Sequence, residues 1–177
     1  MMSRRRIPRP KQTPRASPSR EANSLARAYW LMKSEPFKYA WDELVKDGKT
    51  YWDGVRNYEA RNNLAAMKKG DLAFYYHSNE GKEIVGIAEI VGEAYPDPTT
   101  EDPRWVVVDI SPVVPFTTPV TLTQVKGDPN LAEMGLVQRG RLSVVPVTAE
   151  EFRYVAKLGK TKIPAARKSA SKKASSE

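Results

Sequence analysis

The chain of 177 residues is long enough to bury one sizeable hydrophobic core, and 40% of its residues are apolar. Cysteine is absent, which excludes disulfides, thiolate metal sites and thiol nucleophiles. No apolar run approaches the roughly 20 residues of a membrane-spanning helix, and the first residues form no secretory stretch. We therefore expect an intracellular protein without a membrane partner, located in the cytoplasm, at the nucleoid, or in the nucleus of a eukaryote.

The net charge of +8 is concentrated at the two ends of the chain. Residues 1–28 carry eight basic residues and one acidic residue, and residues 160–177 carry six basic residues and one acidic residue. Both ends are poor in large apolar side chains, so we expect two disordered tails. Such tails either bind polyanions loosely or only keep the protein soluble. The segment 29–159 then has a net charge of −4 and is expected to form one domain.

Strands and short helices are expected in the first part of this segment. A buried strand over residues 28–32 ends before Pro36, because the residue before a proline is pushed out of the helical conformation. Apolar residues recur at helical spacing from Trp41 until the next glycine. Asn57 can cap a second helix that runs to about Met67.

Strands dominate from residue 71 onward. Residues 71–77 alternate between two rows, which are Leu72, Phe74 and Tyr76 on one side and Ala73, Tyr75 and His77 on the other. We expect one row to face the core and the more polar row to face a cleft. A turn at 79–82 leads into a β-branched strand at 84–91, in which Gly86 indicates a bulge.

Two further strands are expected, at residues 105–110 and 142–147. Thr121 is followed three residues later by Gln124, and Thr148 by Glu151. This spacing is typical of capping boxes and predicts two more short helices. Several strands joined by local turns, with few helices, predict an α+β domain built on a small mixed or antiparallel barrel.

Long motifs of unusual composition run along the middle segment. They are YWLMKSEP at 29–36, YWDGVRN at 51–57, RNNL at 61–64, FYYHSN at 74–79 and GIAEIV at 86–91. These motifs closely resemble the EVE domain family, and the resemblance covers essentially all of residues 29–159. It implies a PUA-like pseudo-barrel of mostly antiparallel strands with short peripheral helices. It also implies recognition of a modified nucleobase in DNA or RNA.

A base taken out of a strand needs an aromatic face for stacking and directed groups for its edge. The segment 52–57 offers an aromatic side chain, a glycine turn and donors at a helix start, so we expect Trp52, Val55, Arg56 and Asn57 to line the pocket. In the alternative, Trp52 belongs to the core and Asn57 is only a helix cap.

Other ligand-binding candidates come from several elements, and they are Trp30, Ser34, Tyr75, His77, Trp105, Arg141 and Ser143. Each has a structural alternative: Ser34 can satisfy a turn, and the single histidine can be a hydrogen-bonded structural group. Trp105 can equally be core. If the last strand extends back through Gly140, Arg139, Arg141 and Ser143 alternate on one side. We expect Arg61 and Arg139 at a phosphate-binding rim.

Catalysis requires a nucleophile with a matched acid or base, or a metal. The sequence has one histidine and lacks the glycine-rich phosphate-binding motifs. We therefore expect a non-enzymatic monomer without cofactor or metal, whose partner is a nucleic acid carrying a modified base. The alternative is a hydrolase or small-molecule binder that uses the same pocket, with Glu35 near Lys33 as its reactive pair.

Overall fold

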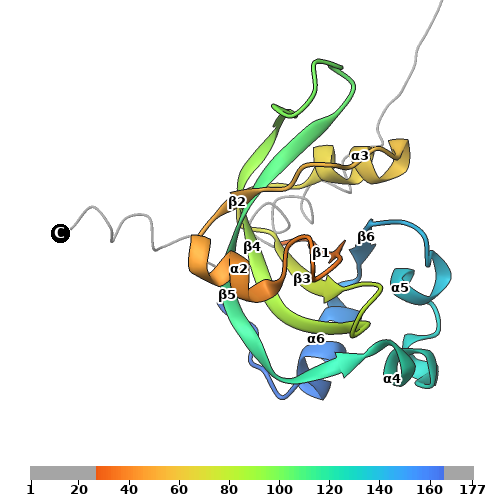
Figure 1. Ribbon diagram of the computed structural model, residues 1–177. Coiled ribbons are helices and arrows are strands. Elements are labelled where there is room, and N and C mark those ends of the chain that lie inside the picture. Colours follow the sequence, from red (N-terminus) through yellow and green to blue (C-terminus); the bar gives the residue numbers. More distant parts are fainter. Residues whose placement is uncertain (1–26, 166–177) are drawn as a thin grey trace, which may run out of the picture. The chain divides into compact units, whose positions relative to one another are not determined.

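Six strands hydrogen-bond into one curled sheet within residues 27–165, the part of the chain that the computed structural model describes (Figure 1). Their order is β2-β5-β4-β3-β1-β6. The strands are β1 (Tyr29–Ser34), β2 (Thr50–Tyr51), β3 (Leu72–His77), β4 (Glu83–Pro96), β5 (Val106–Thr121) and β6 (Val144–Val147). The helices are α2 (Trp41–Asp47), α3 (Tyr58–Ala66), α4 (Leu122–Lys126), the 3-10 turn η1 (Pro129–Leu131), α5 (Gly135–Gln138) and α6 (Ala149–Leu158).

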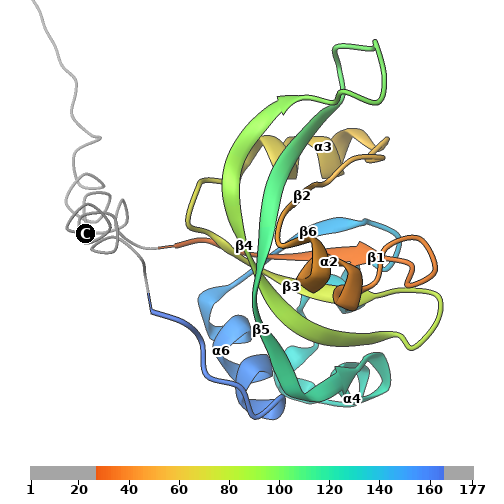
Figure 2. The same cartoon turned by 60° about the vertical axis from the view of Figure 1, so that its left-hand side comes forward.

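β1 and β3 run parallel, with Tyr29 opposite Leu72 and Ser34 opposite His77. Every other strand pair of this sheet is antiparallel. Because β1 and β3 are parallel, both strands end at the same edge of the sheet, and the chain between them forms α2, β2 and α3. The short helices lie around the sheet (Figures 1 and 2). The predicted α+β fold, mostly antiparallel with short peripheral helices, is confirmed.

Helix ends lie where the capping residues predict them. Asn57, Thr121 and Thr148 each accept a hydrogen bond from the third residue of their helix, and the two threonines form complete capping boxes. Gly48 ends α2 with a φ of 81°, a left-handed conformation that glycine adopts without strain.

The core occupies both faces of β3. On one face, Phe74 stacks on Phe152 of α6 at 4.0 Å between ring centroids. On the other face, Tyr75 contacts Trp41 and Trp52, each at 5.5 Å and edge to face. Tyr75 is only 1% exposed. The expectation that the row containing Tyr75 and His77 faces an open cleft is therefore wrong for Tyr75, because helix α2 and Trp52 cover that face.

The predicted bulge at Gly86 is confirmed, since the pairing of β4 with β3 and with β5 shifts there. A Cβ atom at Gly86 would lie 2.7 Å from the ring of Trp41. This close approach requires a residue without a side chain, and it lets Trp41 pack directly on the sheet.

Strand β5 is longer than the predicted 105–110 and continues through Pro112, Pro115 and Pro119 to Thr121. A central strand donates N–H groups to neighbours on both of its sides, and a proline lacks the N–H that one of these hydrogen bonds requires. β2 pairs with β5 only at Asp109 and Ile110, so within residues 27–165 β5 has only β4 as a strand neighbour beyond these two positions. Prolines are tolerated there because the missing N–H groups interrupt no second ladder.

Strand β6 is shorter than the predicted 142–147 and begins at Val144. Helix α5 ends at Gln138 with Arg139 as its C-cap, and Leu142 N–H donates to Arg139 C=O at 3.0 Å to close a turn. The predicted alternation of Arg139, Arg141 and Ser143 along one strand is therefore wrong.

The tails predicted at residues 1–28 and 160–177 lie mostly outside the described residues. The described residues continue to 165, past the predicted end of the domain at residue 159. Thr161 is buried there, and its hydroxyl accepts a hydrogen bond from Thr117 N–H at 2.9 Å. Between residues 27 and 165, no helix is both long and apolar enough to cross a membrane.

Candidate functional site

A cavity of about 650 Å³ opens where β1 ends. Because β1 and β3 are parallel, the last residue of β1, Ser34, lies beside Ser78, which follows β3, and Ser78 N–H donates to Ser34 C=O at 2.9 Å. The lining residues come from four separate stretches of chain, and they are Lys33, Ser34, Glu35, Lys38, Tyr39, Thr50, Tyr51, Trp52, Asp53, Gly54, Val55, Ser78, Gly140, Arg141 and Ser143.

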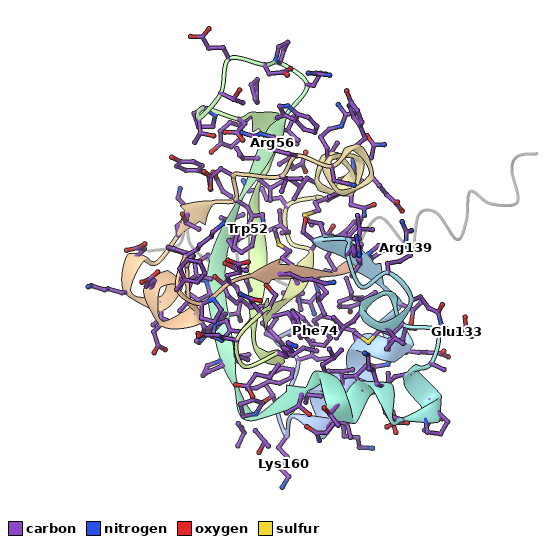
Figure 3. All side chains as sticks on the ribbon, turned by 45° about the vertical axis from the view of Figure 1, so that its right-hand side comes forward. Trp52, Arg56, Phe74, Glu133, Arg139 and Lys160 are labelled. Carbon is purple, nitrogen blue, oxygen red and sulfur yellow. The ribbon has the colours of Figure 1, made fainter. Side chains whose placement is uncertain are left out.

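Trp52 forms an aromatic wall that the core holds in place. Its ring packs edge to face on Tyr75, and its backbone N–H donates to Val108 C=O of β5 at 2.8 Å. The side chain is 8% exposed. Figure 3 shows Trp52 near the middle of the molecule, with Arg56 further along the same segment toward the β4–β5 arm. The indole is therefore fixed before any ligand arrives.

Lys33 ties two walls of the cavity together. Its ammonium donates to Gly140 C=O at 2.8 Å, and its backbone N–H donates to Ser143 C=O at 3.0 Å. Burial lowers the pKa of the Lys33 ammonium from its ordinary value. The 140–143 loop is thereby held against the end of β1.

A tight turn at residues 35–39 forms another wall. Lys38 N–H and Tyr39 N–H both donate to Glu35 C=O, at 2.9 and 3.0 Å. Tyr39 C=O in turn accepts hydrogen bonds from the hydroxyls of Ser34 at 3.0 Å and Tyr75 at 2.6 Å. Burial, followed by the hydrogen bond that it donates to Asp47, raises the pKa of the Tyr39 phenol to about 12. The turn is thus anchored to the core at its closing end.

Apart from Lys33, the charged side chains at the cavity are weakly engaged. Within the described part of the chain, the side chains of Asp53 and Arg141 take part in no hydrogen bond or ion pair. Glu35 meets the Lys38 ammonium only at 3.9 Å, and the Lys38 side chain is 68% exposed. These groups are available to a ligand without breaking a strong internal contact.

Several predicted site residues line this cavity, and they are Ser34, Trp52, Val55, Arg141 and Ser143. Tyr75 lies behind Trp52. Trp30 is buried elsewhere, where its indole N–H donates to Asp71 at 3.0 Å. The Nε2 atom of His77 accepts a hydrogen bond from Trp41 N–H at 3.1 Å, which makes this histidine a cap for α2. Trp30, Tyr75 and His77 therefore do not line the cavity and make internal hydrogen bonds instead.

The remaining predicted residues gather around α3 and the arm formed by the ends of β4 and β5. We call Arg56, Tyr58, Arg61, Arg104 and Trp105 the arginine–aromatic cluster. Trp105 stacks on Tyr58 at 5.3 Å, with Arg56 and Arg104 each 5.6 Å from the Trp105 ring. Arg61 donates to Arg104 C=O at 3.0 Å. The cluster fastens the arm to α3.

Carboxylates neutralise most of the charge around this cluster. Arg56 pairs at 3.0 Å with Asp97, whose side chain is fully buried. Burial acts to raise the pKa of Asp97, but hydrogen bonds from Thr99 and Arg56 outweigh it, and the net pKa is lower than usual. Arg139, expected at a phosphate rim, donates to Glu59 at 2.7 Å. Asn57 caps α3 by accepting from Ala60 N–H at 2.9 Å. None of these side chains is among those that line the cavity.

Sequence reasoning missed Lys38, Tyr39, Thr50, Tyr51 and Ser78 as lining residues. Tyr51 directly precedes Trp52 in the same sequence motif, whereas Ser78 reaches the site through the parallel pairing of β1 and β3, which no local sequence signal indicates. No group of three or more metal-ligating side chains occurs among residues 27–165.

The sequence profile of the EVE domain matches residues 28–158. Among curated proteins, thymocyte nuclear protein 1 of Gallus gallus is 38% identical over 177 aligned residues, covering 80% of this chain and 73% of the relative. Thymocyte nuclear protein 1 of Mus musculus is 40% identical over 168 residues, covering 75% of this chain and 74% of the relative.

Solved structures of similar chains share the fold. A crystal structure of a protein from Agrobacterium tumefaciens is 48% identical, with a TM-score of 0.76 over 77% of this chain and 96% of that one. An NMR structure from Rhodopseudomonas palustris is 57% identical, with a TM-score of 0.72 over 75% and 93%. The human THYN1 protein in complex with DNA containing 5-methylcytosine is 37% identical, with a TM-score of 0.70 over 77% and 99%.

Proposed function

Because the chain belongs to the EVE domain family, we propose that it is a non-enzymatic module that binds a modified nucleobase of DNA in the cavity at the end of β1. The observation that carries the proposal is the combination of a fixed indole, Trp52, with charged groups, Asp53 and Arg141, that have no internal partner in the described chain. The similarity to human THYN1, which was solved with 5-methylcytosine-containing DNA, supports the same reading.

The dimensions of the cavity suit a single base with part of its sugar. Binding pockets for small ligands typically measure about 300–1,000 Å³, and this cavity measures about 650 Å³. A base extruded from a strand presents a flat face and a polar edge. Trp52 and Val55 offer apolar surface for the face, while the Asp53 carboxylate can accept from an exocyclic amine and Arg141 can donate to a ring or carbonyl acceptor.

Charge supports recognition by the pocket over recognition by bulk attraction. The segment 29–159 has a net charge of −4, so its overall charge does not attract a polyanion. At the cavity, Lys38 and Arg141 are the cations that could contact a phosphate beside the bound base, whereas Arg56 and Arg139 are paired with carboxylates elsewhere. We therefore expect contacts with the modified base to contribute more to the affinity of residues 29–159 for DNA than nonspecific attraction to phosphates does.

A panel of labelled oligonucleotides tests the proposal. Fluorescence anisotropy would compare one sequence carrying cytosine, 5-methylcytosine, 5-hydroxymethylcytosine, adenine or N6-methyladenine. We expect one modified base to bind at least about tenfold more tightly than its unmodified counterpart, which corresponds to about 1.4 kcal/mol. Arg141→Ala should reduce this preference, and the matched variant Arg139→Ala, outside the cavity, should retain it. Equal affinity across such a panel, widened to other modified bases, would contradict the proposal.

A second candidate function rests on Lys33 and Glu35, which both line the cavity. A lysine with a lowered pKa and a carboxylate in one cavity could act in hydrolysis of a small substrate. The Lys33 ammonium is nevertheless bonded to Gly140 C=O, which occupies one of its donors. Incubation with modified nucleosides, followed by chromatography, distinguishes the two functions. Product formation that Glu35→Gln abolishes would favour the hydrolase, and unchanged nucleosides would favour the binding module.

A further inference from the structure

An exposed aromatic ring stands beside the mouth of the cavity. Phe37 is 70% exposed, more than any other large hydrophobic side chain among residues 27–165. It occupies the tip of the 35–39 turn, and its neighbours Glu35, Lys38 and Tyr39 all line the cavity. Figure 2 shows this loop, between β1 and α2, projecting from the sheet on the same side as the β3–β4 turn.

The turn that carries Phe37 is rigid at its base. Pro36 restricts its own backbone, and two N–H groups converge on Glu35 C=O. Tyr39 C=O is held by two hydroxyls, from Ser34 at the cavity and from Tyr75 in the core. An apolar ring on an anchored turn loses little conformational freedom when it enters a binding partner.

The electrostatic setting of Phe37 favours an anionic partner. Lys38 follows it directly and is 68% exposed, with only a 3.9 Å contact to Glu35. Arg141 lies at the same cavity without an internal partner in the described chain. A protein groove for a hydrophobic peptide would not require exposed cations near the ring, whereas the phosphates that flank a base step would.

Stacked bases in a duplex cannot reach a cavity of this kind, so the target base must leave the helix. Its departure leaves a gap in the base stack, and proteins that distort DNA commonly fill such gaps with Phe, Leu, Ile or Met side chains. We propose that Phe37 is the wedge that enters the stack at the position of the extruded base, while Lys38 contacts the adjacent phosphate. This inference rests on the proposed function and assigns it double-stranded DNA as the substrate.

Comparing paired and unpaired forms of one oligonucleotide tests the wedge. The probe carries the modified base preferred in the panel above and is prepared in three forms. These are a fully paired duplex, a duplex with an abasic site opposite the modified base, and a single strand. A wedge matters most where extrusion breaks a base pair. Phe37→Ala should therefore weaken binding of the full duplex about tenfold and change binding of the single strand less than about twofold. Phe37→Leu should keep most of the duplex affinity.

A base analogue reports insertion directly. 2-Aminopurine placed beside the modified base should brighten when the wild-type protein binds the duplex, because its stacking is lost, and should brighten much less with Phe37→Ala. Val45→Ala is the matched control, since Val45 is 52% exposed on α2 and does not line the cavity. It should behave as wild type in both measurements.

The outcomes separate this inference from the proposed function. Selective binding of the modified single strand, combined with an unchanged duplex affinity for Phe37→Ala, would overturn the wedge and leave the reader function standing. An equal loss on single strand and duplex would also overturn it, because Phe37 would then act only as part of the pocket. Failure of wild-type protein to select any modified base would remove both proposals.

Discussion

The cavity and the arginine–aromatic cluster flank the same short segment, residues 52–58, and contain similar kinds of side chain with different partners. In the cluster, Arg56 pairs with buried Asp97, and Arg104 forms a multidentate contact with Asp102 that reaches 2.6 Å. At the cavity, Arg141 has no such partner in the described chain. In this domain, the arginines to consider for ligand contact are therefore those whose guanidinium has no carboxylate partner. The sequence motif in which an arginine occurs does not decide this.

The largest expected effects come from replacing Trp52 at the cavity and Trp105 in the arginine–aromatic cluster. Trp52→Ala and Trp105→Ala each remove a nearly buried indole, 8% and 9% exposed, so each should lower the free energy of unfolding by about 3–5 kcal/mol. Chemical denaturation measures both. Only Trp52→Ala should also abolish the preference for a modified base, measured on protein that remains folded. If Trp105→Ala abolished it equally, the cluster would belong to the binding site.

Arg141→Ala comes next and acts on affinity. We expect about a tenfold weaker affinity for the preferred oligonucleotide, because a charged donor to the ligand is lost. The free energy of unfolding should change by less than about 0.5 kcal/mol, since no internal contact is removed. Anisotropy and denaturation on the same preparation check both statements, and a stability loss without an affinity loss would reverse the assignment.

Arg56→Ala should show the opposite pattern. It leaves the buried Asp97 carboxylate without its guanidinium, which should cost about 1 kcal/mol of unfolding free energy. We place the value at the low end because the Arg56 side chain is 40% exposed and partly screened by water. The ratio of modified to unmodified affinities should stay at the wild-type value.

The smallest expected effect is a pH dependence at His77, which lies on neither side of the comparison. Burial lowers the pKa of His77, although Glu83 and Asp42 act in the opposite direction. Its neutral Nε2 accepts from Trp41 N–H, and protonation removes that acceptor. The unfolded state binds the proton more readily, so this contribution is complete above about pH 6.5 and declines as the pH falls through the lowered folded-state pKa.

Thermal unfolding at pH 7 and pH 5 measures this contribution. His77 is the only histidine in the sequence, so His77→Gln isolates its part from that of the carboxylates. The midpoint of wild-type protein should fall more between pH 7 and pH 5 than that of the variant. Parallel decreases in the two proteins would show that His77 does not contribute.

Local signals in the sequence predicted most of the fold. Caps at Asn57, Thr121 and Thr148, and the bulge at Gly86, depend on neighbouring residues and were found where expected. The length of β5 could not be predicted from neighbouring residues in the sequence. Its prolines are acceptable only because one edge has no strand partner there, and that is a property of the whole sheet.

The candidate site was less accessible to sequence reasoning. Trp52 and Val55 lie within one motif and were found at the cavity, whereas Arg56 and Asn57 of the same motif point to other partners. Ser78 joins the cavity only through the parallel pairing of β1 with β3. A motif identifies residues that stay together in sequence, but the partner that satisfies each side chain comes from elements far along the chain.

The walls of the cavity come from residues 33–39, 50–55, 78 and 140–143, so almost the whole folded domain must be in place before the site exists. An unfolded or partly opened chain offers no binding site, and any occupant shifts the folding equilibrium as a whole. By mass action, a ligand at 100 times its dissociation constant should stabilise the domain by about 2.7 kcal/mol. A melting-temperature shift with unlabelled nucleosides is therefore a direct way to identify what the cavity holds, even for ligands that carry no probe.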